Sequence, residues 1–264
     1  MELSSVIGLV LGFVFMVLGM IMGADYDMAK LIAFVDWPSV MITGGGTVAG
    51  MLISYTIPQV ISGLKGVGNI FKAPNNNPAS AINEIINLAN LARREGILAL
   101  EEGAQNMDDQ FLRKGIMLIV DGTDPELVRS ILETELTYVE SRHSSVKGFW
   151  DKVAAMAPAW GMIGTLIGLV LMLLDLDPDT LGAKMAVALL TTFYGSVIAN
   201  YIATPIANKL DNFNSEEMLI KEVLIEGILS IQAGENPRII EEKLKSFFSP
   251  ALREQVNTGT GGGE

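Results

Sequence analysis

The sequence contains no cysteine and a single histidine among its 264 residues. The absence of cysteine excludes disulfide bonds, thiolate chemistry and cysteine-ligated metal sites. One histidine is too few to build the nucleophile, base and orienting group of a hydrolytic enzyme. We therefore expect no catalytic residues, no permanently bound metal and no cofactor.

Charge is missing from four long stretches of the chain. No Asp, Glu, Lys, Arg or His occurs in residues 3–24, 37–64, 153–174 and 185–208. About 20 apolar helical residues are enough to cross the hydrocarbon core of a bilayer. Half of all residues are hydrophobic and the mean hydropathy is +0.40. These features predict an all-α membrane protein with four transmembrane helices, the first of them a retained span and not a cleaved signal.

Basic residues are distributed unevenly between the segments that separate these stretches. Residues 65–152 hold ten of the eighteen Lys and Arg residues and residues 209–253 hold six, which leaves Lys30 and Lys184 for the two short loops. Since basic residues accumulate on the cytoplasmic side, both termini and the long middle segment are expected in the cytoplasm. A net charge of −12 argues against nucleic acid as a partner.

The order of apolar and polar segments predicts five parts. These parts are transmembrane helices 1 and 2, a cytoplasmic helical domain, transmembrane helices 3 and 4, C-terminal cytoplasmic helices, and a disordered tail. In the same order, these parts comprise residues 1–64, 65–152, 153–208, 209–256 and 257–264. Apolar residues continue at helical spacing before the third span and after the fourth, which predicts long cytoplasmic extensions of both helices.

Helix boundary signals divide the polar segments further. Asp124 followed by Pro125 predicts the start of the long helix that leads into the third span. An amphipathic helix is expected from Pro78 to the neighbourhood of Gly96, and a short helix near Leu98. Glycines at 103 and 115 are expected to interrupt the segment that follows.

The four stretches offer hydroxyl groups but no ionisable side chain. If the protein moves an ion, the titrating carboxylate must therefore come from the membrane helix of a partner. A proline also leaves a backbone carbonyl without its usual donor, which makes it available to water or an ion. The alternative is that these threonines bond their own backbone or a neighbouring helix. The candidate residues are Thr43, Thr47, Thr165, Thr191 and Thr192, with Pro158 and Pro205.

Glycine pairs at four-residue spacing predict close approach of the helices. The pairs are Gly8 with Gly12, Gly19 with Gly23, Gly46 with Gly50, and Gly164 with Gly168.

Four segments carry a resemblance to a known family. Residues 157–168 read APAWGMIGTLIG and residues 190–200 read LTTFYGSVIAN; residues 93–102 read RREGILALEE and residues 202–210 read IATPIANKL. With the four-span layout, the chain resembles the MotA/PomA stator subunits of the bacterial flagellar motor, in the MotA/TolQ/ExbB superfamily, from residue 1 to about 255.

This resemblance implies a homopentameric ring around two copies of a single-span MotB/PomB-type partner, whose membrane Asp binds Na⁺ or H⁺. Pro158 and Thr192 match positions beside that Asp, and Pro205 matches a position that contributes to coupling. Charged residues engage the rotor protein FliG in relatives, and they match Arg93 or Arg94, and Glu101 or Glu102, which makes the cytoplasmic helical domain at 65–152 the part that interacts with the rotor. Asn90 and Ala104 stand where some relatives carry further acidic residues.

The resemblance also favours Na⁺ over H⁺, because sodium-driven relatives carry Thr where Thr165 stands and typical proton-driven ones carry Ala. The hydroxyls of Thr165, Thr191 and Thr192 would then join carbonyls and the partner's carboxylate in an oxygen cage. Three other function classes compete with a torque-generating stator. An ExbB/TolQ-type energiser of outer-membrane processes is expected to have three spans, a solute transporter to have binding groups in its spans, and an enzyme to have a catalytic set.

Overall fold

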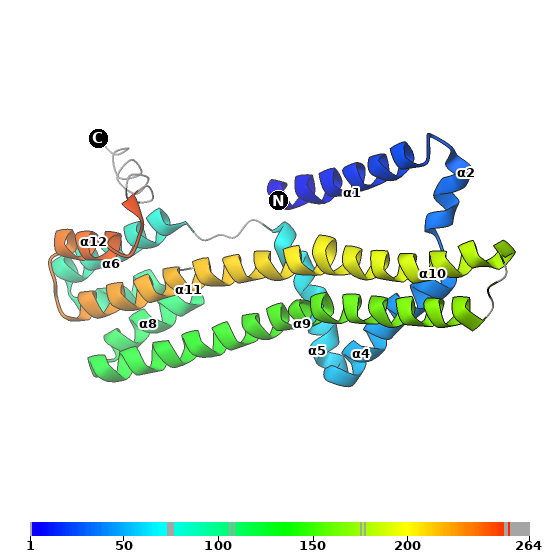
Figure 1. The fold of residues 1–264 in the computed structure, drawn as a ribbon. Coiled ribbons are helices and arrows are strands. Elements are labelled where there is room, and N and C mark those ends of the chain that lie inside the picture. The colour runs from blue at the N-terminus through cyan, green and yellow to red at the C-terminus, as the bar shows by residue number, and fades with distance from the viewer. Residues whose placement is uncertain are drawn as a thin grey trace. The chain divides into compact units, whose positions relative to one another are not determined.

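The protein is described by a computed structural model that covers residues 2–72, 77–105, 107, 109–174, 176, 178–250 and 253. Every regular element in these residues is helical, which confirms the all-α prediction (Figure 1). The tail expected at 257–264 lies outside the described residues. The chain forms two compact units. We call residues 1–73 and 143–212 the span unit, and residues 74–142 and 213–264 the core unit.

The span unit consists mainly of apolar helices. Its N-terminal half comprises α1 (Leu3–Gly23), α2 (Met28–Leu31), η1 (Ile32–Phe34), α3 (Trp37–Val40), η2 (Met41–Gly45), α4 (Gly46–Ser54), α5 (Ile57–Gly66) and η3 (Val67–Phe71). Its second half comprises part of α9 (Pro125–Leu174), then α10 (Pro178–Ser196), the π-helical η5 (Val197–Ala203) and the start of α11 (Thr204–Gln232). Helices α9 and α11 thus contribute residues to both units.

Four helical segments are long and apolar enough to cross a membrane, as predicted. They are Leu3–Gly23, Ala29–Ser54, Pro125–Leu174 and Thr180–Gln232. Helix α1 buries none of its residues against the rest of the protein. Its apolar side chains therefore face lipid or another protein in the membrane.

The apolar stretch 37–64 is not one continuous helix. Helix α4 ends at Ser54, Tyr55 is extended, and α5 begins after Thr56 with Pro58 in its first turn. The Thr56 side chain and Gln59 cap this new helix. A proline in the first turn of a helix and a capping pair favour a helix start, so the chain breaks where the absence of charge predicted continuity. The second candidate span instead begins before the uncharged stretch, at Ala29.

The expected long helices are present. Helix α9 begins at Pro125, and the backbone N–H of Glu126 donates to the Asp124 carboxylate at 3.0 Å, as the capping signal predicted. The fourth span continues through η5 into α11 and ends at Gln232. Both helices therefore extend well beyond the uncharged stretches from which they were predicted.

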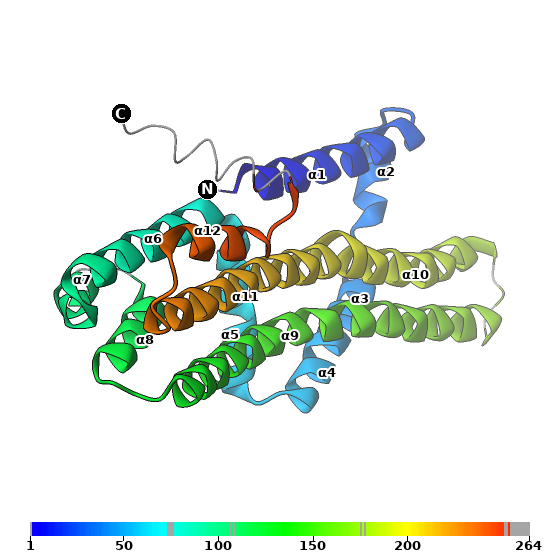
Figure 2. The same cartoon turned by 90° about the vertical axis from the view of Figure 1, so that its left-hand side faces the viewer.

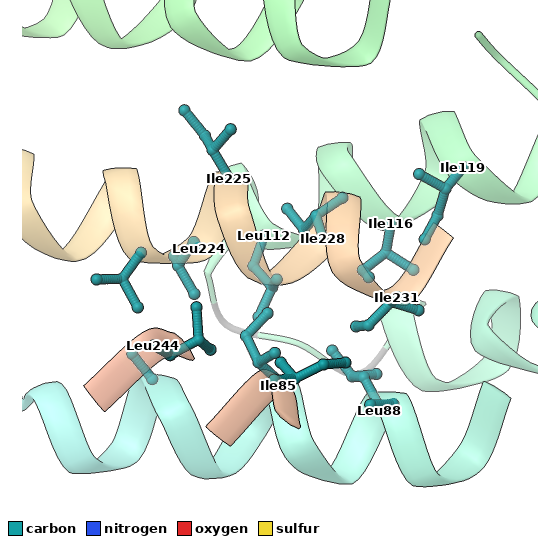
Figure 3. Packing of buried hydrophobic residues seen from close by; sticks show 14 of the residues in the cluster. Ile85, Leu88, Leu112, Ile116, Ile119, Leu224, Ile225, Ile228, Ile231 and Leu244 are labelled. Carbon is teal, nitrogen blue, oxygen red and sulfur yellow. The ribbon is translucent and has the colours of Figure 1, made fainter. Parts of the chain in front are cut away.

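The core unit packs its remaining helices around the soluble ends of α9 and α11. These helices are α6 (Pro78–Glu95), η4 (Ile97–Ala99), α7 (Leu100–Gln105), α8 (Gln110–Val120) and α12 (Pro237–Lys245). Figure 2 shows α12 beside α6. Figure 3 shows side chains of α6, α8, α11 and α12 meeting in one apolar cluster, in which Ile85, Leu112, Ile228 and Leu244 are fully buried. The segments 65–152 and 209–256, separate in the sequence prediction, share this core.

The amphipathic helix predicted from Pro78 to Gly96 is present as α6. The Asn77 carboxamide caps its first turn, and Gly96 ends it at φ +89°, a backbone conformation that favours glycine. The expected interruptions at Gly103 and Gly115 are wrong, because these glycines lie inside α7 and α8. A Cβ at position 115 would lie 2.4 Å from Ile228 Cδ1, so this glycine lets α8 approach α11 closely.

Candidate ion pathway between the third and fourth spans

Helices α9 and α10 meet along a row of glycines on α9. A Cβ added at Gly161 would lie 2.7 Å from the backbone oxygen of Thr191, and one at Gly164 would lie 2.4 Å from the Thr191 side chain. A Cβ at Gly168 would lie 2.9 Å from Ala188. The backbones of the two helices are therefore packed as closely as glycine allows, and no larger residue fits at these positions.

Pro158 lies in the same seam, inside α9. A Cβ on Gly195 of α10 would lie 2.6 Å from the Ala157 carbonyl oxygen and 3.1 Å from the Cα atom of Pro158. Pro158 has no backbone N–H, so the Ala154 carbonyl one turn earlier loses its usual helical donor. The half-buried Pro158 thus combines a carbonyl that lacks its usual helical donor with close contact between the two spans.

Two threonine hydroxyls join the helices one turn further along. The Oγ1 atoms of Thr165 and Thr192 are 2.6 Å apart, and Thr165 Oγ1 is 2.9 Å from the Ala188 carbonyl oxygen. A hydroxyl has one proton and two lone pairs. With Thr165 donating to that carbonyl, Thr192 donates to Thr165 and keeps its lone pairs free on the exposed face of α10. Such an oxygen is a suitable ligand for a hard cation or a water molecule.

The remaining candidate threonines are buried, and their hydroxyls bond to backbone oxygens of the span unit. Thr191 is fully buried, and its hydroxyl bonds to the backbone oxygens of Val187 and Ala188 on its own helix. Thr43 donates to the Thr191 carbonyl at 3.2 Å, and Thr47 donates to its own helix. The structure thus brings Thr165 and Thr192 together at a surface, whereas Thr43, Thr47 and Thr191 follow the structural alternative that threonines in membrane helices usually adopt.

Two tyrosines of the fourth span connect it to the N-terminal helices. The Tyr194 hydroxyl donates to the Phe34 carbonyl at 2.5 Å and accepts from the Asp36 N–H at 3.0 Å. The Tyr201 hydroxyl donates to the Leu9 carbonyl, and its ring fills the space beside Gly12. Sequence reasoning missed both residues, although their seven-residue spacing places them on one helical face.

The glycine prediction is confirmed for only some of the pairs. Trp160 and Met156 pack against Gly46 and Gly50, and Tyr201 packs against Gly12. No heavy atom of the described residues lies within 4 Å of a Cβ built at Gly8, Gly19 or Gly23. Helix α1 therefore touches the rest of the span unit at few points.

Pro205 lies far along the fourth span from the hydroxyl pair. It follows Thr192 by thirteen residues, which corresponds to about 20 Å of helix. It lines an apolar groove of about 600 Å³ between α1, η3 and η5. The structure does not bring Pro158 and Pro205 together, so any coupling between them has to pass along the helix.

The four charged residues predicted to meet a rotor protein lie in the core unit, around the turn at Gly96. Arg93 and Arg94 are in the last turn of α6, and Glu101 and Glu102 are in the first turn of α7. All four are exposed. Basic residues at a helix C-terminus and acidic residues at an N-terminus also stabilise the helix dipoles, so their placement has a structural explanation as well.

Within the described residues, no group of three or more His, Cys, Asp or Glu residues could hold a metal ion.

Comparison with known proteins identifies the family. A model of the MotA/TolQ/ExbB proton channel family matches residues 103–223. Motility protein A of Treponema pallidum (strain Nichols) is 38% identical over 257 residues, covering 97% of both chains. Chemotaxis protein PomA of Vibrio alginolyticus is 38% identical over 254 residues, covering 96% of this chain and 98% of the relative.

Solved structures of stator complexes agree with this assignment. The flagellar MotAB stator complex from Bacillus subtilis contains a chain with a TM-score of 0.85 and 30% identity, covering 96% of this chain and 98% of that one. A chain of the C. jejuni MotAB structure also has a TM-score of 0.85, at 27% identity. The match covers 95% of this chain and 97% of that one. The chain belongs to the MotA/TolQ/ExbB proton channel family as a multi-pass membrane subunit of the MotA/PomA flagellar stator type, an ion-channel component and not an enzyme.

Proposed function

We propose that this chain forms a homopentameric ring around a dimer of a MotB/PomB-type single-span partner and converts cation influx into rotation against the rotor protein FliG. The four stretches without Asp, Glu, Lys, Arg or His carry this proposal, together with the Thr165 and Thr192 hydroxyl pair. The matched structures are MotAB complexes, which supports a partner of the MotB type. The membrane is the bacterial inner membrane, with both termini and the core unit in the cytoplasm.

The partner supplies the carboxylate that binds the cation. A bare hydrocarbon region stabilises no charge, so a travelling cation needs a counter-ion inside the bilayer. Residues 3–24, 37–64, 153–174 and 185–208 offer none. Pro158, Thr165 and Thr192 supply neutral oxygens beside the position of that carboxylate, and Thr191 holds the two helices together. Pro205 contributes to coupling at the other end of the span.

Na⁺ is the proposed cation. Two hydroxyl oxygens at the seam, a carbonyl freed by Pro158 and a carboxylate together provide the hard oxygen ligands that a small metal cation requires. A proton needs no such cage. In cells that depend on this stator, replacing Na⁺ by K⁺ at constant proton motive force is expected to stop motility. Motility that persists after the replacement would assign the motor to H⁺.

The exposed charges around Gly96 form the proposed rotor surface. Paired arginines and paired glutamates present both signs within one short segment, and complementary charges on a partner speed and orient docking. Leu98 lies between them and is 75% exposed. An apolar side chain surrounded by charges is the arrangement expected at the centre of a protein contact.

Charge reversal tests this surface. The double variant Arg93→Glu, Arg94→Glu is expected to abolish torque while the protein still accumulates in the membrane and binds its partner, because both side chains are exposed and support no core contact. Arg238→Glu, also exposed and on α12, is the matched control and should leave swimming speed unchanged. Compensating reversals in FliG should restore rotation. Unchanged swimming in the double variant would remove the rotor assignment.

An ExbB/TolQ-type energiser is the alternative, because the family model also covers those proteins. Near full-length similarity to motility proteins favours the stator. Loss of swimming on deletion of this chain, with outer-membrane uptake intact, is the result expected of a stator. The opposite result would support the energiser.

A further inference from the structure

The fourth span carries a row of polar residues at four-residue spacing. This row extends well beyond the Thr165 and Thr192 hydroxyl pair. Beginning at Thr192, every fourth residue to the end of the span unit is polar. We call these residues the polar row: Thr192, Ser196, Asn200, Thr204, Asn208 and Asn212. Thr204 is half-buried and the other five are exposed. The row therefore runs from the proposed cation site to the charged part of α11.

Most hydroxyls in the spans are satisfied inside the chain, but those of the polar row beyond Thr192 are not. Ser39, Thr43 and Ser54, for example, each donate to a backbone oxygen of the span unit. By contrast, Ser196 and Thr204 make no side-chain hydrogen bond to any described residue. Unsatisfied polar groups are costly in hydrocarbon, so this face of the helix does not lie against lipid acyl chains.

Asn200 is oriented with its oxygen outward. Its Nδ2 atom donates to the Ser196 carbonyl at 3.1 Å, and among the described residues nothing donates to its Oδ1 atom. The amide thus uses its donor on its own helix and keeps its acceptor available. A cation or a water molecule would meet an oxygen at this position.

Part of this segment is π-helical, and this backbone keeps the polar row on one side of the helix. An α-helix has about 3.6 residues per turn, so residues four apart drift steadily around it. The π-helical stretch Val197–Ala203 has wider turns, which reduces that drift between positions 196 and 204. Pro205 follows this stretch after Thr204 and supplies no N–H, so a carbonyl in the preceding turn also loses a donor. Oxygen groups are therefore kept in line over the length of η5.

We propose that the polar row lines a hydrated path by which the cation leaves the Thr165 and Thr192 site for the cytoplasm. This inference rests on the function proposed above. Ser196 and Asn200 accept the cation and its remaining waters after the partner's carboxylate releases it, and Thr204 and Asn208 pass it to the cytoplasmic end. There the exposed Asp211 carboxylate, 3.8 Å from the Lys147 ammonium, marks the beginning of the charged region.

Thiol accessibility tests the path directly, because the chain has no cysteine. Single variants Ser196→Cys, Asn200→Cys and Thr204→Cys are assembled with the partner in inside-out membrane vesicles. They are treated with a membrane-impermeant trimethylammonium methanethiosulfonate, which needs water and a thiolate to react. Ile202→Cys is the matched control, since it is an exposed apolar position on the same span that lies off the polar row.

The three polar-row cysteines are expected to react at least about tenfold faster than the control, with the cationic label blocking ion flux. Polar-row cysteines that react as slowly as the control would mean that the row is packed dry against a neighbouring subunit, and would overturn the proposal. Flux through the unmodified complex is measured in the same vesicles. If that flux is absent, the proposed function fails; if it is present and the cysteines are unreactive, only the path fails.

A second measurement does not depend on labelling. Asn200→Leu removes the outward oxygen and is expected to lower cation flux about tenfold, the change in rate that accompanies losing one polar partner at a barrier. Asn200→Ser, which keeps a polar oxygen in the form of a hydroxyl, should recover most of it. Membrane abundance and partner binding are compared in both variants. Flux equal to wild type in a normally assembled Asn200→Leu complex would contradict the path.

Discussion

The span unit and the core unit differ in how much of their packing relies on buried apolar side chains, although the span unit also has a small buried cluster around Phe149 and Trp150. In the core unit, large side chains such as Ile85, Leu112 and Leu224 are almost fully removed from solvent. In the span unit, α1 buries none of its residues, and α9 meets α10 through glycine and threonine. Lipid is as apolar as leucine, so burying leucine between spans gains little, whereas burial from water contributes about 25 cal/mol per Å². The difference between the units reflects the difference between their solvents.

The largest expected effect compares the same substitution in the two units. Leu224 on α11 is 2% exposed and Leu18 on α1 is 46% exposed. Leu224→Ala is expected to destabilise the core unit by about 2–5 kcal/mol, because it leaves a cavity. Leu18→Ala should cost less than about 1 kcal/mol. Amide hydrogen exchange of α8 in purified protein gives the first value and that of α1 the second.

Equal costs at these two positions would show that α1 is packed against another protein as tightly as the core unit is packed internally. That result would contradict the explanation that lipid around the spans and water around the core unit cause the difference in packing.

A smaller effect is expected from glycine to alanine in the two units. At Gly161 the new Cβ would meet a backbone oxygen at 2.7 Å, which cannot move without separating α9 from α10. Gly161→Ala should cost about 1–3 kcal/mol and reduce motility. At Gly115 the nearest atom is the terminal methyl of Ile228, which can rotate away, and alanine gains about 1 kcal/mol of helix propensity. Gly115→Ala should therefore be nearly neutral.

Thermal unfolding of the solubilised protein and swimming speed measure both variants. A larger loss at Gly115 than at Gly161 would mean that the core unit tolerates less crowding than the seam between the spans.

The four spans and the long helices were predictable because charge and helical spacing are local properties of the sequence. The absence of charge in residues 3–24 and the capping signal at Asp124 needed no knowledge of tertiary structure. The break after Ser54 was missed, although Pro58 and the Thr56–Gln59 pair signalled it. Apolar composition predicts a continuous span there, whereas these capping residues predict a new helix.

The contacts of the candidate site depended on non-local geometry. The sequence gives no register between α9 and α10, so it did not reveal that Thr192 meets Thr165 while Thr191 is buried. The shared core of α8 and α12 joins segments that are more than one hundred residues apart. The π-helical stretch Val197–Ala203 has no compositional signal that we recognised. The roles of Pro158, Thr165 and Thr192 in ion passage remain predictions.

The smallest expected effect concerns ion pairing, which the core unit uses and the uncharged spans cannot. The Glu226 carboxylate lies 2.6 Å from the Lys243 ammonium and 3.0 Å from the Arg129 guanidinium. Hydrogen bonds from Lys243 and then Arg129 hold the pKa of Glu226 below its ordinary value of 4.5. Because the folded-state pKa is lowered, this stabilisation is fully present above the unfolded-state pKa and is lost as the pH falls through the folded-state pKa.

Glu226→Gln is accordingly expected to destabilise the core unit by about 1 kcal/mol at pH 7, a modest value because the pair is partly exposed to solvent. The difference from wild type should shrink as the pH falls below about 4.5. Glu133→Gln, whose carboxylate is 3.6 Å from Arg129 and more exposed, is the matched control and should change stability less. Amide hydrogen exchange of α11 and α12 at pH 7 and pH 4 measures both. A difference that grows on acidification would mean that Glu226 is held in its protonated form, which would contradict the lowered pKa and leave the core unit dependent on apolar burial alone.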